Sequence, residues 1–587
     1  MRFTENTPAA WQRSTFAIAL IGSILLWEAL LPIAGGWFGW LGWIAPIPWL
    51  LLITLEYLPG RRPYWALYLA GLVFWLLAIH WLILPYPALT WLGWLSLSAY
   101  LAVYLPAFVG IARIAVHRFD WPLWLAAPVA WTGLELVRAH LLTGFLMASL
   151  AHTQVHNVPV IQISDLVGEY GVDFVVMLAA ACLTQMLLVW VLNSKSAYRN
   201  PQTKLRRGTV AALPAVVTLA AVLVYGYVRI SIATPERSER GPRIALIQGN
   251  SQAEWKLDPN REDQIMREYI GLTERAVSET SQNGRPLDLV VWPETMYRSP
   301  LRDFDSGFKF STQVTATAEE LAASDRKQLA NLARHVGVPI LIGIDRLRLV
   351  ADDNSASERP TIQVFNSSVL VEPDGKIVGT YDKMHRVMFG EYIPFADWLP
   401  FLYRITPLTG GIVAGTEPAA LRTSSGYLFA PNICYETAIP HVIRRQVATL
   451  DRRGEHPDAL VNLTNDAWYW RSSELDMHLA CDVFRAVETR VPIVVAANGG
   501  ISASIDCLGR IRHQLGKQVS DFLVVDVEPG LKSSWYVRFG DWFAGLCLFA
   551  SLFFVMVEWR ARRALRRRSV RPASSETIEL PPSPPVR

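Results

Sequence analysis

Long apolar stretches constrain this 587-residue chain more than any other feature. A membrane-crossing helix needs about 20 predominantly apolar residues. Eight windows approach that length, at residues 15–34, 37–55, 65–84, 94–112, 123–147, 174–192, 209–228 and 542–557. The last window is short, but Trp535, Phe539 and Trp559 flank it as interface anchors. We therefore predict a membrane domain over residues 1–231 with about seven transmembrane helices, and an eighth transmembrane helix within 535–560.

Positive charge between these windows predicts how the chain is oriented. Basic residues precede the first window and follow the second, fourth, sixth and eighth, whereas the connections "GG" and "PYPAL" after the first and third windows are nearly uncharged. We expect both termini in the cytoplasm and residues 240–530 on the outer side of the membrane. The net charge of +4 reflects this asymmetry and does not indicate nucleic-acid binding. Residues 561–587 are predicted to be a basic tail that becomes disordered.

Residues 240–530 have the composition of a soluble protein and alternate strand-like with helix-like segments, which is typical of an α/β domain. Asp-Gly and Leu-Gly turns in 372–379 and 506–511 predict two hairpins. No G-x-G-x-x-G, G-K-[ST] or H-E-x-x-H pattern occurs, so we expect no nucleotide cofactor and no metal. Strands are predicted at 243–249, 287–292, 338–344, 362–371, 427–434, 459–465, 492–498 and 522–527, and helices at 260–281, 317–336, 438–449 and 474–490.

The chain has five cysteines. Cys182 and Cys547 lie in apolar windows, where cysteine behaves as a small hydrophobic residue. A disulfide between Cys481 and Cys507 would suit an oxidising compartment, but the sequence does not determine it. Cys434 would then remain as a free thiol.

Three strand ends or adjoining loops carry polar residues that a strand does not need. "VVWPETMY" places Glu294 after a buried strand, "YDKMHRVMFGEYIPF" carries Lys383, and "NICYE" carries Cys434. Ligands bind at the carboxyl ends of strands in open α/β sheets. A cysteine at a strand-to-helix turn can be a nucleophile whose thiolate the helix N-terminus favours, a carboxylate can take its proton, and an ammonium can stabilise an oxyanion. Each residue alone is more often structural, but together they predict an acyl-transfer site.

The segments "WPET", "YDKMHRVMFGEYIPF" and "NICYE", in this order in an α/β domain, resemble the carbon–nitrogen hydrolase (nitrilase) superfamily. That superfamily uses a Glu-Lys-Cys triad in an α-β-β-α sandwich. A nitrilase-like domain between seven spans and a final span is similar to the apolipoprotein N-acyltransferase family of the bacterial inner membrane. The resemblance covers most of the chain and includes "QGN" (248–250), "TNDAWY" (464–469), "RAVETRVPIVVAANGGISA" (485–503) and "LELVRAHLLTGF" (134–145).

The resemblance implies a role for each site residue. Glu294 would be the general base, Lys383 the oxyanion stabiliser and Cys434 the nucleophile, while Glu391 would support the site. Cys434 would take an acyl chain from a membrane phospholipid, and the α-amino group of a diacylglyceryl-modified apolipoprotein would then accept it from the thioester. No cofactor is needed, because the ester supplies the driving force. We expect a monomer that has no nucleic-acid partner.

The resemblance also implies supporting roles for residues that hold the nucleophile turn or line the lipid entrance: Tyr435 and Glu436 for the turn, Trp255 and Trp468 for the entrance. Two segments depart from the family pattern, since Met388 stands where Pro is usual and Tyr469-Trp470 replaces the common Phe-Gly. Both are predicted to lie in loops over the cleft. In the membrane part, Glu135 and Arg138 share a helix face. Two interpretations remain open for them, a structural ion pair or a contact with a phospholipid headgroup.

Two other interpretations compete with the acyltransferase. A membrane-tethered nitrilase-type amidase would share the triad and use water as the acceptor. A transporter or scaffold with an inactive nitrilase domain is disfavoured by the intact triad and by the few charged residues in the spans. The identity of the acceptor therefore separates the two enzymes.

Overall fold

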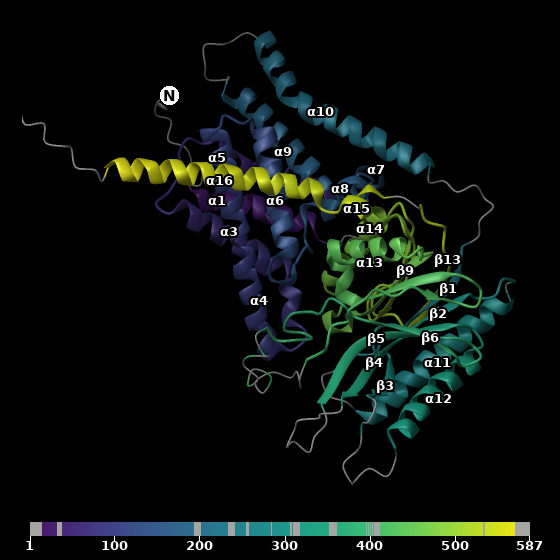
Figure 1. Cartoon of the computed structure of the whole chain (residues 1–587). Coiled ribbons are helices and arrows are strands. Elements are labelled where there is room, and N and C mark those ends of the chain that lie inside the picture. The colour runs from purple at the N-terminus through teal and green to yellow at the C-terminus, as the bar shows by residue number, and fades with distance from the viewer. Residues whose placement is uncertain are drawn as a thin grey trace, which may run out of the picture.

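The computed structural model consists of a helical N-terminal part, an α/β domain and a long C-terminal helix that packs back against the helical part (Figure 1). Trp255 and residues 570–587 of the predicted tail lie outside the described residues. The structure describes residues 14–31, 38–192, 201–232, 241–253, 258–282, 284–305, 308, 317–350, 361–394, 396, 398, 401, 403, 411–531 and 534–569.

Apolar helices build the N-terminal part. Four stretches are long and apolar enough to cross a membrane, at residues 90–118, 169–190, 209–232 and 542–566. Shorter apolar helices occupy 15–29, 39–54 and 63–78, where the sequence predicts three further spans. That all of these helices cross a bilayer stays a prediction. The principal helices are α1 (Thr15–Ala29), α2 (Ile47–Thr54), α3 (Pro63–Ala78), α4 (Pro87–Leu101), α5 (Tyr104–Arg118), α6 (Leu123–His140), α9 (Glu169–Leu192), α10 (Pro201–Ile232) and α16 (Trp542–Ser569).

The α/β domain contains two stacked sheets. One has the order β13-β1-β2-β4-β5-β6, with β3 also paired to β4, and the other has the order β12-β11-β10-β9-β8-β7. The strands are β1 (Arg243–Gln248), β2 (Leu289–Val291), β3 (Tyr297–Phe304), β4 (Ile340–Val350), β5 (Thr361–Val371), β6 (Ile377–Asp382), β7 (Leu421–Arg422), β8 (Leu428–Ile433), β9 (Ala459–Asn465), β10 (Ile493–Asn498), β11 (Ala503–Ile505), β12 (Ile511–Gln514) and β13 (Asp521–Asp526).

Helices cover the outer face of each sheet. The helices α11 (Pro259–Gln282) and α12 (Ala318–Val336) share a buried apolar cluster with the first sheet, and α13 (Pro440–Arg452) and α14 (Glu474–Thr489) share one with the second. A third cluster joins the inner faces of the two sheets, as with Leu246 of β1 and Val461 of β9. These layers form the α-β-β-α sandwich that the sequence predicts.

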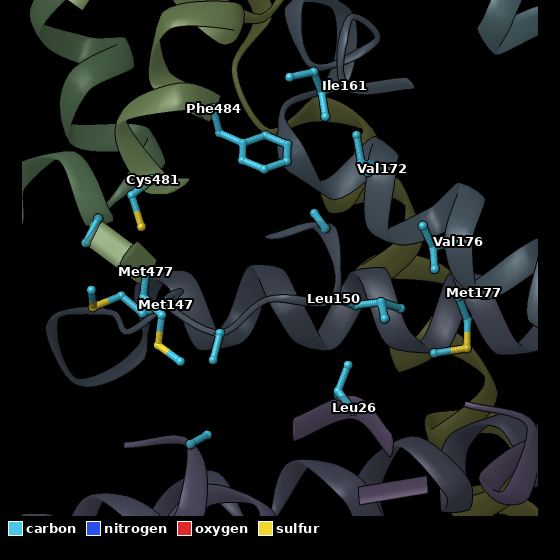
Figure 2. Close-up of a cluster of buried hydrophobic side chains, with 14 of the residues drawn as sticks. Leu26, Met147, Leu150, Ile161, Val172, Val176, Met177, Met477, Cys481 and Phe484 are labelled. Carbon is cyan, nitrogen blue, oxygen red and sulfur yellow. The ribbon is translucent and has the colours of Figure 1, made fainter. Parts of the chain in front are cut away.

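Helix α14 also packs against the N-terminal part. Figure 2 shows Met477, Cys481 and Phe484 facing side chains of the segment 147–177, all within one buried apolar cluster. Buried ion pairs lie at the same junction: Arg485 contacts Glu169 at 3.1 Å and Arg490 contacts Asp165 at 2.8 Å. Buried charges are tolerated only when they are paired, so these contacts fix the α/β domain on the helical part.

The predicted strands and helices of the α/β domain all occur, with ends shifted by a few residues. Both predicted hairpins are present, as β5–β6 and β11–β12. Strand β3 was not predicted, because "YRSPLRDF" contains a proline and several charged residues that disfavour a strand. The cysteines are free thiols, so the open question of a Cys481–Cys507 disulfide is answered in the negative. Helix α16 continues to Ser569, into the segment predicted as a tail.

Candidate active site

Glu294 follows β2 after the turn Trp292-Pro293 and is 7% exposed. The Asn366 side-chain amide donates to its Oε1 at 2.6 Å, and the Asn465 backbone N–H donates to its Oε2 at 3.0 Å. Lys383 Nζ lies 3.4 Å from the same Oε1. Donors from three different strands or strand ends therefore hold this carboxylate at the edge between the two sheets.

Lys383 directly follows β6, and its side chain is 1% exposed. Its backbone N–H donates to Asn366 O at 2.8 Å, and its Nζ donates to Glu391 Oε1 at 2.7 Å. Burial alone would lower the pKa of Lys383, but Glu391 and Glu294 raise it well above its usual range. The side chain is therefore a permanent ammonium ion at neutral pH, aimed between two carboxylates.

Cys434 is the first residue after β8 and opens a short 3-10 turn, Cys434–Ala438, that leads into α13. Its φ is 52°, a left-handed conformation that a non-glycine residue adopts only at a cost of about 1–3 kcal/mol. His478 of α14 hydrogen-bonds the Cys434 carbonyl oxygen through Nε2 at 3.1 Å. The nucleophile position is thus a sharp turn held by a neighbouring helix.

Opposing effects set the ionisation of Cys434. Burial raises the pKa of Cys434 well above its usual range, and Glu294 raises it further. Lys383 and a hydrogen bond from Thr464 oppose this rise without cancelling it. The resting site therefore holds a thiol, because desolvation outweighs the local positive charge. A thiol needs a base at the moment of attack, and Glu294 is the carboxylate beside it.

Glu436 is completely buried and joins two of the three site segments. Its Oε1 accepts the backbone N–H groups of Met384 and His385 at 2.8 and 3.0 Å. Its Oε2 accepts the Ile433 N–H at 2.7 Å and the Tyr381 hydroxyl at 2.8 Å. One carboxylate therefore fixes the loop that carries the lysine against the turn that carries the cysteine.

Replacement of Glu436 by alanine should disorder both segments, because several buried donors lose their acceptor at about 1–3 kcal/mol each. We expect a fall in Tm of several degrees and at least about a 10-fold loss of acyl-transfer rate per folded molecule. Glu372→Ala is the matched control, since Glu372 is a buried carboxylate that accepts from Ser424 away from the site. The control should lose stability only; equal losses of rate in both variants would refute a special role for Glu436.

Tyr435 reaches the N-terminal part, where its hydroxyl donates to Gly144 O at 3.0 Å. The same loop is held by Arg138, which donates to Phe145 O at 3.1 Å and to Met147 O at 2.9 Å. Arg138 also forms a buried ion pair with Glu135. The structure therefore favours the structural interpretation of the Glu135–Arg138 pair over a headgroup contact, and it links helix α6 to the nucleophile turn.

Sequence reasoning missed Asn366 of β5. Its amide nitrogen donates to Glu294 at 2.6 Å and lies 3.3 Å from Glu391 Oε1, so it bridges the two carboxylates. The signal in the sequence is the polar run Asn366-Ser367-Ser368 inside the apolar segment 362–371. Glu391 itself lies where the resemblance places it, with Oε2 accepting the Val387 N–H at 2.7 Å.

A second missed group lies beneath Cys434. Donor atoms of Asp466, Glu474 and His478, all buried, lie within 4.8 Å of one another, as ligands of a metal would. Burial lowers the pKa of His478, but Asp466 more than reverses this and brings it to about 10. Both ring nitrogens of His478 already contact oxygen atoms, since Nδ1 lies 3.3 Å from Asp466 Oδ1 and Nε2 lies 3.1 Å from the Cys434 carbonyl oxygen. His478 instead holds the backbone of the nucleophile.

The structure describes one of the two residues predicted to line the lipid entrance. Trp255 lies outside the described residues, and Trp468 is half-buried in the short turn Asp466–Tyr469 that follows β9. Tyr469 packs edge-on against Trp81 at 5.1 Å between ring centroids. Trp470, where the family commonly has Gly, is exposed and has a φ of 53°. Exposed aromatic side chains here are suited to contact acyl chains.

Two family models match the chain. Residues 243–536 match the carbon-nitrogen hydrolase family, and residues 22–182 match the apolipoprotein N-acyltransferase N-terminal domain. The sandwich and its Glu-Lys-Cys cluster, together with the matching family model, thus define a carbon–nitrogen hydrolase domain with thiol chemistry.

Curated relatives identify the branch of that superfamily. The apolipoprotein N-acyltransferase of Rhodopirellula baltica is 32% identical over 93% of this chain and 98% of its own length. That of Geobacter metallireducens is 32% identical over 86% of this chain and 89% of its own length. The chain belongs to the apolipoprotein N-acyltransferase family. An amidase from Nesterenkonia sp. is 20% identical and covers 51% of this chain and 93% of its own, but its TM-score of 0.32 adds no argument.

Proposed function

We propose that this chain transfers an acyl chain from a membrane phospholipid to the α-amino group of the diacylglyceryl-cysteine at the N-terminus of apolipoproteins, the last step of lipoprotein maturation. The proposal rests on family membership together with one observation. Lys383 Nζ lies between Glu294 and Glu391 beside the turn of Cys434, with the charges and burial that acyl transfer needs.

In the first half-reaction, Glu294 takes the thiol proton as Cys434 Sγ attacks the phospholipid ester carbonyl. The Lys383 ammonium donates to the oxyanion, and Glu391 keeps that ammonium aimed at it. When the tetrahedral intermediate collapses, the glycerol oxygen leaves and receives the proton from Glu294. The products are a lysophospholipid and an S-acyl thioester.

In the second half-reaction, the uncharged α-amino group of the apolipoprotein attacks the thioester carbonyl. Lys383 again stabilises the oxyanion, and Glu294 takes a proton from the attacking nitrogen. Collapse of the intermediate breaks the C–S bond, and Glu294 returns the proton to the Cys434 sulfur. The product is an amide, and the thiol is regenerated.

A membrane location suits two lipid-anchored substrates. Lifting an acyl chain out of the bilayer costs about 0.8 kcal/mol per methylene, and a site beside the bilayer avoids that cost. We place the chain in the bacterial inner membrane as a multi-pass monomer with both termini cytoplasmic and residues 240–530 periplasmic. The basic gaps between apolar windows and the four long apolar helices support this placement.

Intact-mass measurement tests the proposed function. Purified protein incubated with phospholipid alone should gain one acyl mass, which hydroxylamine should remove. Addition of a diacylglyceryl-modified peptide should then yield an N-acyl peptide and protein of the starting mass. If folded protein gains no acyl mass but hydrolyses simple amides, the amidase alternative holds and phospholipid is not the donor.

A further inference from the structure

Asp345 is an acidic residue in the middle of β4 that lies on the face where the site is built. Its directly opposed partner in β5 is Asn366, the residue that bridges Glu294 and Glu391. Opposed residues of antiparallel strands have side chains on the same face, about 4.5–5.5 Å apart at Cβ. Side chains two residues apart also share a face, and a Cβ at Gly343 would meet the Glu294 Cα at 2.6 Å. Asp345 therefore faces the catalytic cleft.

The side chain of Asp345 has no hydrogen-bond or ion-pair partner in the part of the chain that the structure describes, and the residue is exposed. The groups packed around this carboxylate remove part of its water shell, which raises the pKa of Asp345 to about 6. Arg298 of β3 opposes this rise, and Glu294 and Glu391 add to it. An unpaired carboxylate beside two others is suited to receive a cation.

The second half-reaction supplies such a cation. An α-amino group has a pKa of about 7.7–8.0, so at neutral pH the acceptor arrives mostly as an ammonium ion. An ammonium has no lone pair and must lose one proton before attack, and a second proton during attack. Glu294 holds one proton at a time, so it serves the second transfer but not the first.

We propose that Asp345 binds the α-ammonium group of the incoming acceptor and takes its first proton. The inference rests on the proposed function. A carboxyl group whose pKa is about 6 lies about two units below the α-amino group, whereas an ordinary aspartate at about 3.9 lies about four units below it. Proton transfer to Asp345 is therefore less uphill than to an ordinary surface acid.

The protons balance over the half-reaction. The ammonium N–H bond breaks and its proton passes to an Asp345 carboxylate oxygen, which leaves the neutral amine. Nitrogen attacks the thioester, Glu294 removes the second proton, and that proton goes to Cys434 sulfur as the C–S bond breaks. The proton on Asp345 leaves to water, because the side chain is exposed.

Asp345→Asn tests this role, because it keeps the shape of the side chain and removes its charge and basicity. The acyl-enzyme is first formed on full-length protein with phospholipid, and its rate of formation should stay within about twofold of wild type. Transfer to a diacylglyceryl peptide at pH 7 should fall at least about 10-fold. The deficit should shrink severalfold at pH 9, where the amine is already neutral. Hydroxylamine, an uncharged nucleophile at pH 7, should deacylate both proteins equally fast.

Glu319→Gln is the matched control, since Glu319 is an exposed acid on α12, on the outer face of the sandwich. It should leave both half-reactions unchanged. Equal slowing of acylation and transfer in Asp345→Asn, or unchanged transfer to the peptide, would overturn the role of Asp345. Absence of acyl-enzyme in the wild-type protein would instead refute the proposed function, so the two failures are distinguishable.

Discussion

Replacement of Cys434 by alanine is expected to abolish the acyl-enzyme and to reduce transfer to the lipopeptide by at least about 10³-fold. No other atom of the site can form the thioester, and triad members removed singly in enzymes of this kind cost several orders of magnitude. The fold should survive, because the Cys434 backbone contacts, including the bond to His478, do not involve the side chain. The measurement is intact mass after incubation with phospholipid, alongside Tm.

The other thiols provide the control. Cys481 and Cys507 are buried in the same domain, and burial raises the pKa of each above its usual range. Cys507→Ala should therefore gain the acyl mass as wild type does. A hydroxylamine-sensitive acyl mass that persists in Cys434→Ala would place the nucleophile elsewhere and contradict the assignment of the site.

Most of the sandwich could be predicted from the sequence because its central strands are short apolar runs that alternate with amphipathic helices. Strand β8, which is buried throughout, and helix α12, which buries one face, are examples. The segments that carry Glu294 and Cys434 could be found because each follows a buried apolar strand, whereas Lys383 follows the half-exposed edge strand β6. The local sequence pattern was sufficient to locate a site residue where that residue directly follows a single recognisable strand.

The rest depends on contacts between elements that no local pattern encodes. Asn366 and Asp345 each stand beside other polar residues inside a strand, and their placement at the site depends on the β4–β5 register and the nearby Glu294. The thiol form of Cys434 was also unpredictable, because desolvation depends on the whole enclosing structure. The sequence indicates the helix N-terminus and the lysine that favour the thiolate, but the burial that opposes them depends on residues far apart in the chain.

Lys383→Met should lower both the rate of acyl transfer and the stability of the fold, and the two effects can be measured separately. Loss of one oxyanion donor costs about 10²–10³ in rate, and the acylation half-reaction should fall at least that far. Removing one partner of a buried ion pair also costs about 3–5 kcal/mol. Here Glu294 and Glu391 would remain side by side on the Asn366 amide without a counter-charge, so Tm should fall by several degrees.

The double variant Lys383→Met/Glu391→Gln distinguishes the two effects. It removes one carboxylate together with the ammonium, so the buried charge that remains is the Glu294 carboxylate, still held by Asn366 and the Asn465 N–H. Tm should recover most of its loss, whereas the rate of acyl-enzyme formation should not recover, because no cation faces the oxyanion. If activity returned with stability, Lys383 would be a structural counter-ion and another group would have to stabilise the oxyanion. If neither returned, the Lys383–Glu391 pair would be required for the loop to fold.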